Sequence, residues 1–389
     1  MFSSRTSWER SPNRLAAALA ERRATGVDTI DLTESNPTRC GLSPDAGTLN
    51  AALAGPSIEA YDPQPRGLSV AQNAIRSYYA DDGAAIDEQQ IVVTTSTSES
   101  YAFAFQLLAD PGDEILAPRP SYPLLPYLAD LHDVSLTSYQ LVYDHGWAVD
   151  LEALEAAITP LTKAIVAVSP NNPTGSYLAI EERRRIVRIA AEHSLALIVD
   201  EVFRDYAWAE SGSRPESTVT EEGCLTLTMN GLSKISALPQ MKLGWMVMSG
   251  ARDIREEALA RLEVIGDTYL SVATPVQHAA AALLGLRHEV QARILTRVRE
   301  NLRLLDELLT GSACDRHQAE AGWYAVVRVP RTRGDEQWAL DLLAAGVHVH
   351  PGYLFDSPEE GLLVLSLLTP RTEFREGVRR LVDLAGRAD

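Results

Sequence analysis

Residues 164–201 read AIVAVSPNNPTGSYLAIEERRRIVRIAAEHSLALIVDE, and this stretch decides the fold class. Its two short apolar runs, at 164–169 and 195–200, are rich in β-branched residues and predict buried strands. Between them, Ile186, Ile189 and Ala190 recur at the spacing of an amphipathic helix, with charged residues around them. A strand, a helix and a second strand predict a parallel sheet, which binds ligands at the carboxyl ends of its strands.

Outside this stretch, the chain predicts a larger sheet and a second unit. The apolar runs IVVTT at 91–95 and LTLTMN at 225–230 are two further candidate strands. The last hundred residues differ, with a long charged helix near 285–310, strands in GWYAVVRVP and HVHPGYLF, and a closing helix at 371–385. We expect an α/β protein: a large domain over 49–284 with a mostly parallel sheet between helices, and a smaller α/β domain built from residues 1–48 and 285–389.

Composition narrows the function classes. With 35 basic and 53 acidic residues, the net charge of −18 argues against binding to nucleic acid or to an anionic membrane. The three cysteines, Cys40, Cys224 and Cys314, lie far apart and in no metal-ligand spacing, so we predict neither disulfides nor a metal site. We find no signal-peptide pattern and no apolar run of membrane-spanning length, and we expect a cytoplasmic location.

Two of the predicted strands end on unusual polar chemistry. The segment SPNNPTG places Asn171 and Asn172 directly after the first strand, where a tight turn is the simpler explanation. Asp200 and Glu201 close the second strand, and a buried carboxylate is costly unless a cation or hydrogen-bond donors meet it. A structural ion pair is the alternative to a functional site here.

Two more strand ends carry an amine and a run of hydroxyl groups. Lys234 lies among Leu232, Ile235 and Leu238, a setting that can lower its pKa from about 10.4 and favour the neutral, nucleophilic amine. The run TTSTS at 94–98 leads into a predicted helix, whose free N–H groups and hydroxyls suit an anion. A solvated surface lysine and an ordinary helix cap are the alternatives.

Together these groups match one ligand. Pyridoxal phosphate needs an anion site for its phosphate, a carboxylate for its ring nitrogen, an amide for its ring oxygen and an amine for its aldehyde. With NNPTG, DEVF and NGLSK in this order, followed by MKLGW, the chain resembles the fold-type I pyridoxal-phosphate enzymes of the class I/II aminotransferase family. The resemblance runs from TESNPTRCG near the start to PGYLF and LSLLTP near the end, and it implies an aspartate aminotransferase-like fold.

The resemblance also implies roles for individual residues. Lys234 matches the lysine that forms the Schiff base and moves the Cα proton, and Asp200 matches the carboxylate that keeps the pyridine nitrogen protonated. Asn172 matches the amide that meets the ring oxygen and can face the substrate carboxylate, and Tyr122 matches the aromatic ring stacked on the cofactor. The residues matched to the phosphate site are Ser96, Thr97, Ser98, Ser233, Lys242 and, from the partner subunit of an implied homodimer, Tyr61.

The sequence departs from the family pattern at three positions. Phe203 stands where the family usually has a tyrosine, so one donor to the ring oxygen is missing. Gly231 stands where many members have a phosphate-binding serine, and Val364 stands where the family binds the substrate α-carboxylate with an arginine. Arg39 is our candidate to supply a guanidinium instead, with Arg371 as a weaker one, although a surface arginine explains either residue.

The function that follows from the resemblance is transamination between an amino acid and a 2-keto acid through Lys234. The alternative is another reaction of the same cofactor, such as β-elimination by a C–S lyase, decarboxylation or racemisation, because these enzymes share the cofactor landmarks. A non-catalytic regulatory module is disfavoured, since Lys234 is present and no helix-turn-helix extension is found.

Overall fold

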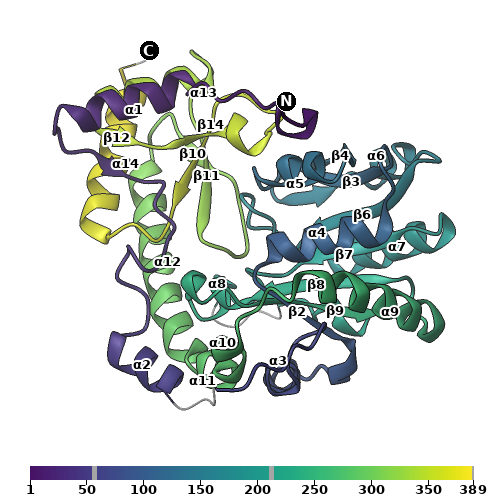
Figure 1. Ribbon diagram of the computed structural model, residues 1–389. Helices are drawn as coiled ribbons and strands as arrows, with labels where there is room; N and C mark the ends of the chain where they lie inside the picture. Colours follow the sequence, from purple (N-terminus) through teal and green to yellow (C-terminus); the bar gives the residue numbers. More distant parts are fainter. Residues whose placement is uncertain (55–58, 210–213, 388–389) are drawn as a thin grey trace.

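The computed structural model describes residues 1–54, 59–209 and 214–387, and Figure 1 shows a large sheet beside a smaller unit. The large sheet has eight strands in the order β2-β9-β8-β7-β6-β3-β4-β5. Neighbours from β8 through β4 run parallel, whereas β9 is antiparallel to β2 and β8, and β5 is antiparallel to β4. The strands are β2 Ile91–Thr94, β3 Glu114–Arg119, β4 Ser135–Tyr143, β5 Trp147–Val149, β6 Thr162–Val168, β7 Ala196–Asp200, β8 Thr226–Gly231 and β9 Gly244–Ser249.

The stretch 164–201 forms the centre of this sheet. Every residue of β7 is buried, as expected of a strand covered by helices on both faces. The helix α7 (Ile180–Glu192) buries Ile186, Val187, Ile189 and Ala190, which confirms the predicted amphipathic helix. The predicted fold class, a mostly parallel sheet between helices with a smaller unit beside it, is confirmed.

Helices cover both faces of the sheet. One face packs against α4, α5 and α9 in a core that includes Phe105, Met246 and Leu262, and the other face packs against α6 and α7. A third core lies where α3, α10 and α11 meet β2 and β9. The helices are α3 Ser69–Asp81, α4 Thr97–Leu108, α5 Leu125–Leu131, α6 Leu151–Ala156, α8 Leu232–Ile235, α9 Arg252–Tyr269, α10 Thr274–His278 and α11 Ala280–Gly285, with short helices η2 Glu88–Gln90, η3 Thr218–Thr220 and η4 Pro239–Met241.

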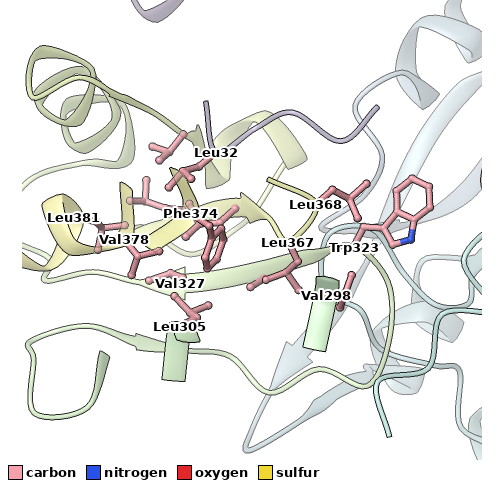
Figure 2. Close-up of a cluster of buried hydrophobic side chains, with 14 of the residues drawn as sticks. Leu32, Val298, Leu305, Trp323, Val327, Leu367, Leu368, Phe374, Val378 and Leu381 are labelled. Carbon is pink, nitrogen blue, oxygen red and sulfur yellow. The ribbon is translucent and has the colours of Figure 1, made fainter. Parts of the chain in front are cut away.

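The smaller unit is built around a four-stranded antiparallel sheet in the order β10-β11-β14-β13. Figure 2 shows its core, where Phe374 and Leu381 of α14 meet Val327 of β11 and Leu305 of α12. The elements are α12 Arg287–Leu309, β10 Asp315–Arg316, β11 Tyr324–Arg328, α13 Asp335–Ala344, β12 Val347–His348, β13 His350–Pro351, η5 Gly352–Phe355, β14 Leu362–Ser366 and α14 Arg371–Ala385.

The start of the chain packs on this smaller unit. β1 (Ile30–Asp31) pairs in parallel with β12, and Leu15 and Leu32 belong to the same core as α12 and α14. The remaining N-terminal elements are η1 Ser4–Thr6, α1 Arg14–Ala24 and α2 Ala46–Ala54. The division into domains at 48/49 and 284/285 stays a prediction. None of the helices in the described ranges is both long and apolar enough to cross a bilayer.

Candidate active site

The parallel strands bring three of the sequence motifs to one edge of the sheet. In the register of β6, β7 and β8, Val168 lies beside Asp200, and Asp200 lies beside Met229. The segments that follow these strands therefore start at the same level, although they are far apart in the sequence. They carry Asn172, Asp200 and Lys234.

Lys234 lies in an aromatic setting. It is part of the short helix α8, directly after β8, and its Nζ is 5.5 Å from the ring centroid of Phe203 and 5.2 Å from that of Trp323. Burial lowers the pKa of the Lys234 amine, and the nearby Asp200 carboxylate opposes this shift. The amine therefore loses its proton more readily than an exposed lysine does, as a nucleophilic lysine requires.

Asp200 is a buried carboxylate held by hydrogen bonds. Oδ1 accepts from the backbone N–H of Val202 at 3.0 Å, and Oδ2 accepts from the hydroxyl of Tyr101 at 3.4 Å. Burial raises the pKa of Asp200 to about 6, and the hydrogen bonds and Lys234 act in the opposite direction. This perturbed acid next to a perturbed lysine is typical of a functional site.

The neighbouring carboxylate, Glu201, has a different environment. Its side chain accepts hydrogen bonds from the Ser217 hydroxyl at 2.6 Å and from the Thr218 backbone and hydroxyl at 2.8 and 3.0 Å. Arg204 lies 3.9 Å away, also buried. Glu201 therefore has the structural ion pair that was the alternative for this pair of carboxylates. Asp200 is the residue whose charge acts on Lys234.

The two adjacent asparagines divide in the same way. Asn171 is buried and holds the turn, because its Oδ1 accepts from Thr174 Oγ1 at 3.1 Å and its Nδ2 donates to the Pro120 carbonyl at 3.4 Å. The Oδ1 of Asn172 is also buried, but it has no hydrogen-bond partner within the described residues. A buried polar atom without a partner is rare and indicates a missing ligand or water.

The hydroxyl run forms the start of α4. Ser96 is the helix cap, and its Oγ accepts from the Glu99 N–H at 3.3 Å, while Thr94 Oγ1 bonds with Ser100 Oγ at 2.8 Å. The cap alternative therefore accounts for Ser96. Thr97 and Ser98 are half-buried in the first turn, where helix N–H groups favour an anion.

Two further residues matched to the phosphate site lie around α8. Ser233 is half-buried within the helix, and Lys242 is exposed in a left-handed backbone conformation. Gly231 pairs with Gly244 across β8 and β9, and a Cβ on Gly231 would lie 3.0 Å from the Gly244 Cα. The glycine at this departure from the family pattern therefore suits the close approach of the two strands.

The structure places the remaining candidates at different depths. Tyr122 is 39% exposed, and both burial and the Asp200 charge raise its pKa, so it lies close to that carboxylate. Tyr61 is 77% exposed, and no contact between Tyr61 and Lys234 is found among the described residues. The Arg39 side chain is 74% exposed and pairs with Glu34 at 3.4 Å. Arg371 is exposed at the start of α14.

The carboxylate-clamp position is apolar. Val364 is 1% exposed, lies opposite Val326 and His350 in neighbouring strands, and packs with Phe355 and Leu362. No metal site is found either, since the described ranges contain no group of three His, Cys, Asp or Glu residues arranged to hold a metal ion.

Sequence reasoning missed one residue that supports the site. Tyr206 is buried, and its hydroxyl donates to the Lys234 carbonyl at 2.6 Å, which holds the backbone of α8. Tyr206 and Trp323 also pack edge to face, with ring centroids 5.0 Å apart. No spacing in the sequence announces this contact, because it depends on the path of the loop after β7.

Comparison with known proteins agrees with this geometry. The family model described as aminotransferase class I and II matches residues 28–381. The chain is 30% identical to the glutamate-pyruvate aminotransferase AlaA of Escherichia coli K12 over 262 residues, which is 67% of this chain and 64% of that protein's length. It is 27% identical to the aspartate/prephenate aminotransferase of Thermus thermophilus, covering 96% of this chain and 95% of that one.

A solved structure shows the same fold. The alanine aminotransferase from Pyrococcus furiosus superposes with a TM-score of 0.89 over the full length of both chains, at 24% sequence identity. The sequence motifs at the strand ends, the fold and the family match all agree, and the predicted family is confirmed. This chain belongs to the class I and II aminotransferase family.

Proposed function

We propose that the protein is a pyridoxal-phosphate-dependent aminotransferase that moves an amino group between an amino acid and a 2-keto acid. One observation carries this proposal: a lysine with a lowered pKa, a buried carboxylate and an unpartnered amide converge at the carboxyl edge of one sheet. Relatives named for glutamate-pyruvate and aspartate/prephenate transamination support it.

The residues at this edge fit the cofactor. Asp200 supplies the negative charge that a protonated pyridine nitrogen needs, and the Asn172 side chain has an unsatisfied buried atom for a polar ligand group. Tyr122 supplies an aromatic face. The phosphate would be held by hydroxyls and N–H groups at the start of α4 and around α8, namely those of Ser96, Thr97, Ser98 and Ser233. Lys242 of the same chain would add a positive charge, and Tyr61 of the partner subunit would add a hydroxyl.

The chemistry is then divided between the cofactor and the chain. When bound, pyridoxal phosphate accepts the electron pair that the substrate Cα releases as it loses its proton. Lys234 holds the cofactor and carries the proton on Nζ, and burial, which lowers the pKa of this amine, favours its neutral form. Above pH 6, Asp200 is ionised and stabilises positive charge beside it. Phe203 and Trp323 lie beside the amine with their rings.

A homodimer and a cytoplasmic location complete the proposal. The exposed position of Tyr61 is consistent with a residue that acts in the site of a second copy. Size-exclusion chromatography with light scattering would test the dimer. Mixing Tyr61→Phe subunits with Lys234→Ala subunits would then test whether Tyr61 acts across the interface, since a mixed dimer retains one intact site.

The three lysines of the chain allow a sharp test of the central claim. The purified protein is loaded with pyridoxal phosphate, reduced with borohydride and digested, and mass spectrometry then locates the attached cofactor. We expect attachment at Lys234, none in Lys234→Ala, and normal attachment in the control Lys163→Ala, whose lysine pairs with Asp113 at 3.5 Å.

The reaction is tested by supplying amino donors and 2-keto acids to the loaded protein. We expect stoichiometric conversion of a donor to its keto acid and of an acceptor to its amino acid, measured by chromatography. Lys234→Ala should lose at least about a thousandfold in rate, since the nucleophile is removed. Attachment at another lysine, or release of ammonia without amino-acid product, would overturn the proposal.

A further inference from the structure

The small antiparallel sheet carries an apolar patch on the face opposite its main core. It consists of Tyr324 and Val326 of β11, Leu362 and Val364 of β14, and Phe355 of η5, and we call it the apolar wall. The intervening residues of both strands, among them Val327 in Figure 2, point into the core on the other side of the sheet. The alternation therefore gives this small sheet a second apolar face, separate from its main core.

The apolar wall is continuous with the surroundings of Lys234. The ring of Tyr324 lies 6.3 Å from that of Phe203, and the Phe203 ring lies 5.5 Å from the Lys234 Nζ. At the other end, the Phe355 carbonyl accepts a hydrogen bond from the Ser121 N–H at 2.9 Å, directly before Tyr122. The wall therefore approaches Lys234 through Tyr324 and Phe203.

Three arginines in segments next to the wall are already paired with carboxylates. Arg39 pairs with Glu34 at 3.4 Å, and Arg119 pairs with Asp356 at 3.0 Å, next to Phe355. Arg328, at the end of β11, pairs with Asp315. These guanidinium groups have carboxylate partners before any substrate arrives.

The polar side chain beside the wall is neutral near pH 7. His350 lies opposite Val364 in the strand register, so the two side chains share a face, and its ring is 5.8 Å from that of Phe355. Burial lowers the pKa of His350 to about 4, and the titratable groups that act on it are His348, which lowers the pKa further, and Asp31, which raises it. A carboxylate pressed against this wall would lose water without gaining a positive partner, which is unfavourable.

We propose that the apolar wall binds an uncharged part of the substrate, so that amino donors with an apolar side chain are favoured over dicarboxylic donors. This inference rests on the proposed transaminase function and deepens it by naming the substrate class. The apolar contacts come from Tyr324 and Phe355, with Val364 beneath them and the His350 ring beside them. A pocket discriminates by leaving the wrong group unpaired as much as by binding the right one.

The test compares two kinds of ligand on the wild-type holoenzyme. We expect kcat/KM for L-leucine and L-phenylalanine to exceed that for L-glutamate and L-aspartate by about tenfold or more. Calorimetry gives a second readout that needs no turnover: 4-methylpentanoate should bind more tightly than glutarate, which differs in carrying a second carboxylate. Equal or better use of L-glutamate would overturn the inference and leave the transaminase proposal intact. If no donor reacts, the transaminase proposal fails, and the two binding constants still report on the wall.

A charge placed at the wall gives the converse test. In His350→Lys we expect the leucine-to-glutamate ratio of kcat/KM to fall by about tenfold, whereas His350→Gln, which stays neutral, should keep it. Gln337→Lys adds the same charge on the exposed surface of α13 and serves as the control. Melting temperatures identify any variant that fails to fold, and Leu354→Lys, at a half-buried position packed on the wall, then replaces it. A folded His350→Lys or Leu354→Lys enzyme with an unchanged ratio would contradict the proposal.

Discussion

Two regions near the carboxyl ends of β6, β7 and β8 adjoin at Asp200 and Glu201 and differ in their bonding. At the candidate site, Asp200 and Asn172 have few protein partners, and Lys234 is shielded by rings. In the adjacent ion-pair network, formed by Glu201, Arg204, Asp82, Arg214 and Asp205, each charge has an opposite charge within 4 Å.

The difference shows what each region is for. Charges that are paired inside the protein hold the loop after β7 in place. Polar groups that remain unpaired lower the stability of the ligand-free protein, and they gain their partners when a ligand binds. Substitutions in the two regions should therefore affect stability and ligand binding in opposite ways.

The largest effect on stability is expected from breaking the ion-pair network. Arg204 is 5% exposed, and Arg204→Met leaves the buried Glu201 carboxylate without its cation, whereas Asp82 keeps its pair with Arg214. We expect the free energy of unfolding, measured with urea at pH 7, to fall by about 3–5 kcal/mol. The control Arg252→Met removes an exposed pair with Glu256 and should leave the free energy of unfolding nearly unchanged. Equal losses in the two variants would show that the network is not structural.

The adjacent carboxylates should respond in opposite directions. In the ligand-free protein, Asp200 has a pKa of about 6 because of burial, above the roughly 4 of an unfolded chain, so folding stability falls as the pH rises between these values. Asp200→Asn should therefore raise the free energy of unfolding at pH 8 by roughly 2–3 kcal/mol, with no gain near pH 4.

Glu201→Gln provides the matched comparison for Asp200→Asn. It removes the carboxylate that accepts hydrogen bonds from Ser217 and Thr218, so we expect lower stability at pH 8. Urea unfolding of both apoproteins from pH 4 to pH 8 measures the two curves. Two curves shifted in the same direction would refute the division between site and network.

The ends of the apolar runs predict much of this division, but not which member of each pair finds partners inside the protein. The apolar runs were enough to predict β6, β7 and β8, because buried parallel strands lack a polar face, and Lys234 and Asp200 follow from their ends. Asn171 and Asn172, or Asp200 and Glu201, are equivalent in the sequence. Only the folded turns decide which side chain finds partners, and the Tyr206 contact and the apolar wall depend on the same long-range packing.

The adjacent asparagines give a smaller effect of the same kind. Asn171→Ala removes the acceptor for Thr174 and should lower the apoprotein's free energy of unfolding by about 1–3 kcal/mol. Asn172→Ala removes a buried atom that has no partner, so it should not lower that stability, and it should weaken pyridoxal phosphate binding by about tenfold. Equilibrium dialysis and urea unfolding measure the two quantities, and the reverse pattern would exchange the two roles.

The smallest effect is expected at Phe203, where the family usually has a tyrosine. Phe203 is 3% exposed, with Trp323 and Tyr324 at ring distances of 5.2 and 6.3 Å, so a hydroxyl added in Phe203→Tyr enters an aromatic setting. Without cofactor, the buried hydroxyl should cost about 1 kcal/mol. With cofactor, the hydroxyl gains a polar neighbour beside Lys234, so the loss in melting temperature should be smaller in the loaded protein than in the apoprotein.

The pH midpoint of the holoenzyme absorbance should also fall in Phe203→Tyr, because the added donor favours the deprotonated form of the bond between Lys234 and the cofactor. An identical loss of melting temperature with and without cofactor would mean that position 203 contributes only to the core. The polar groups that gain a partner from the ligand would then be limited to Asn172 and Asp200.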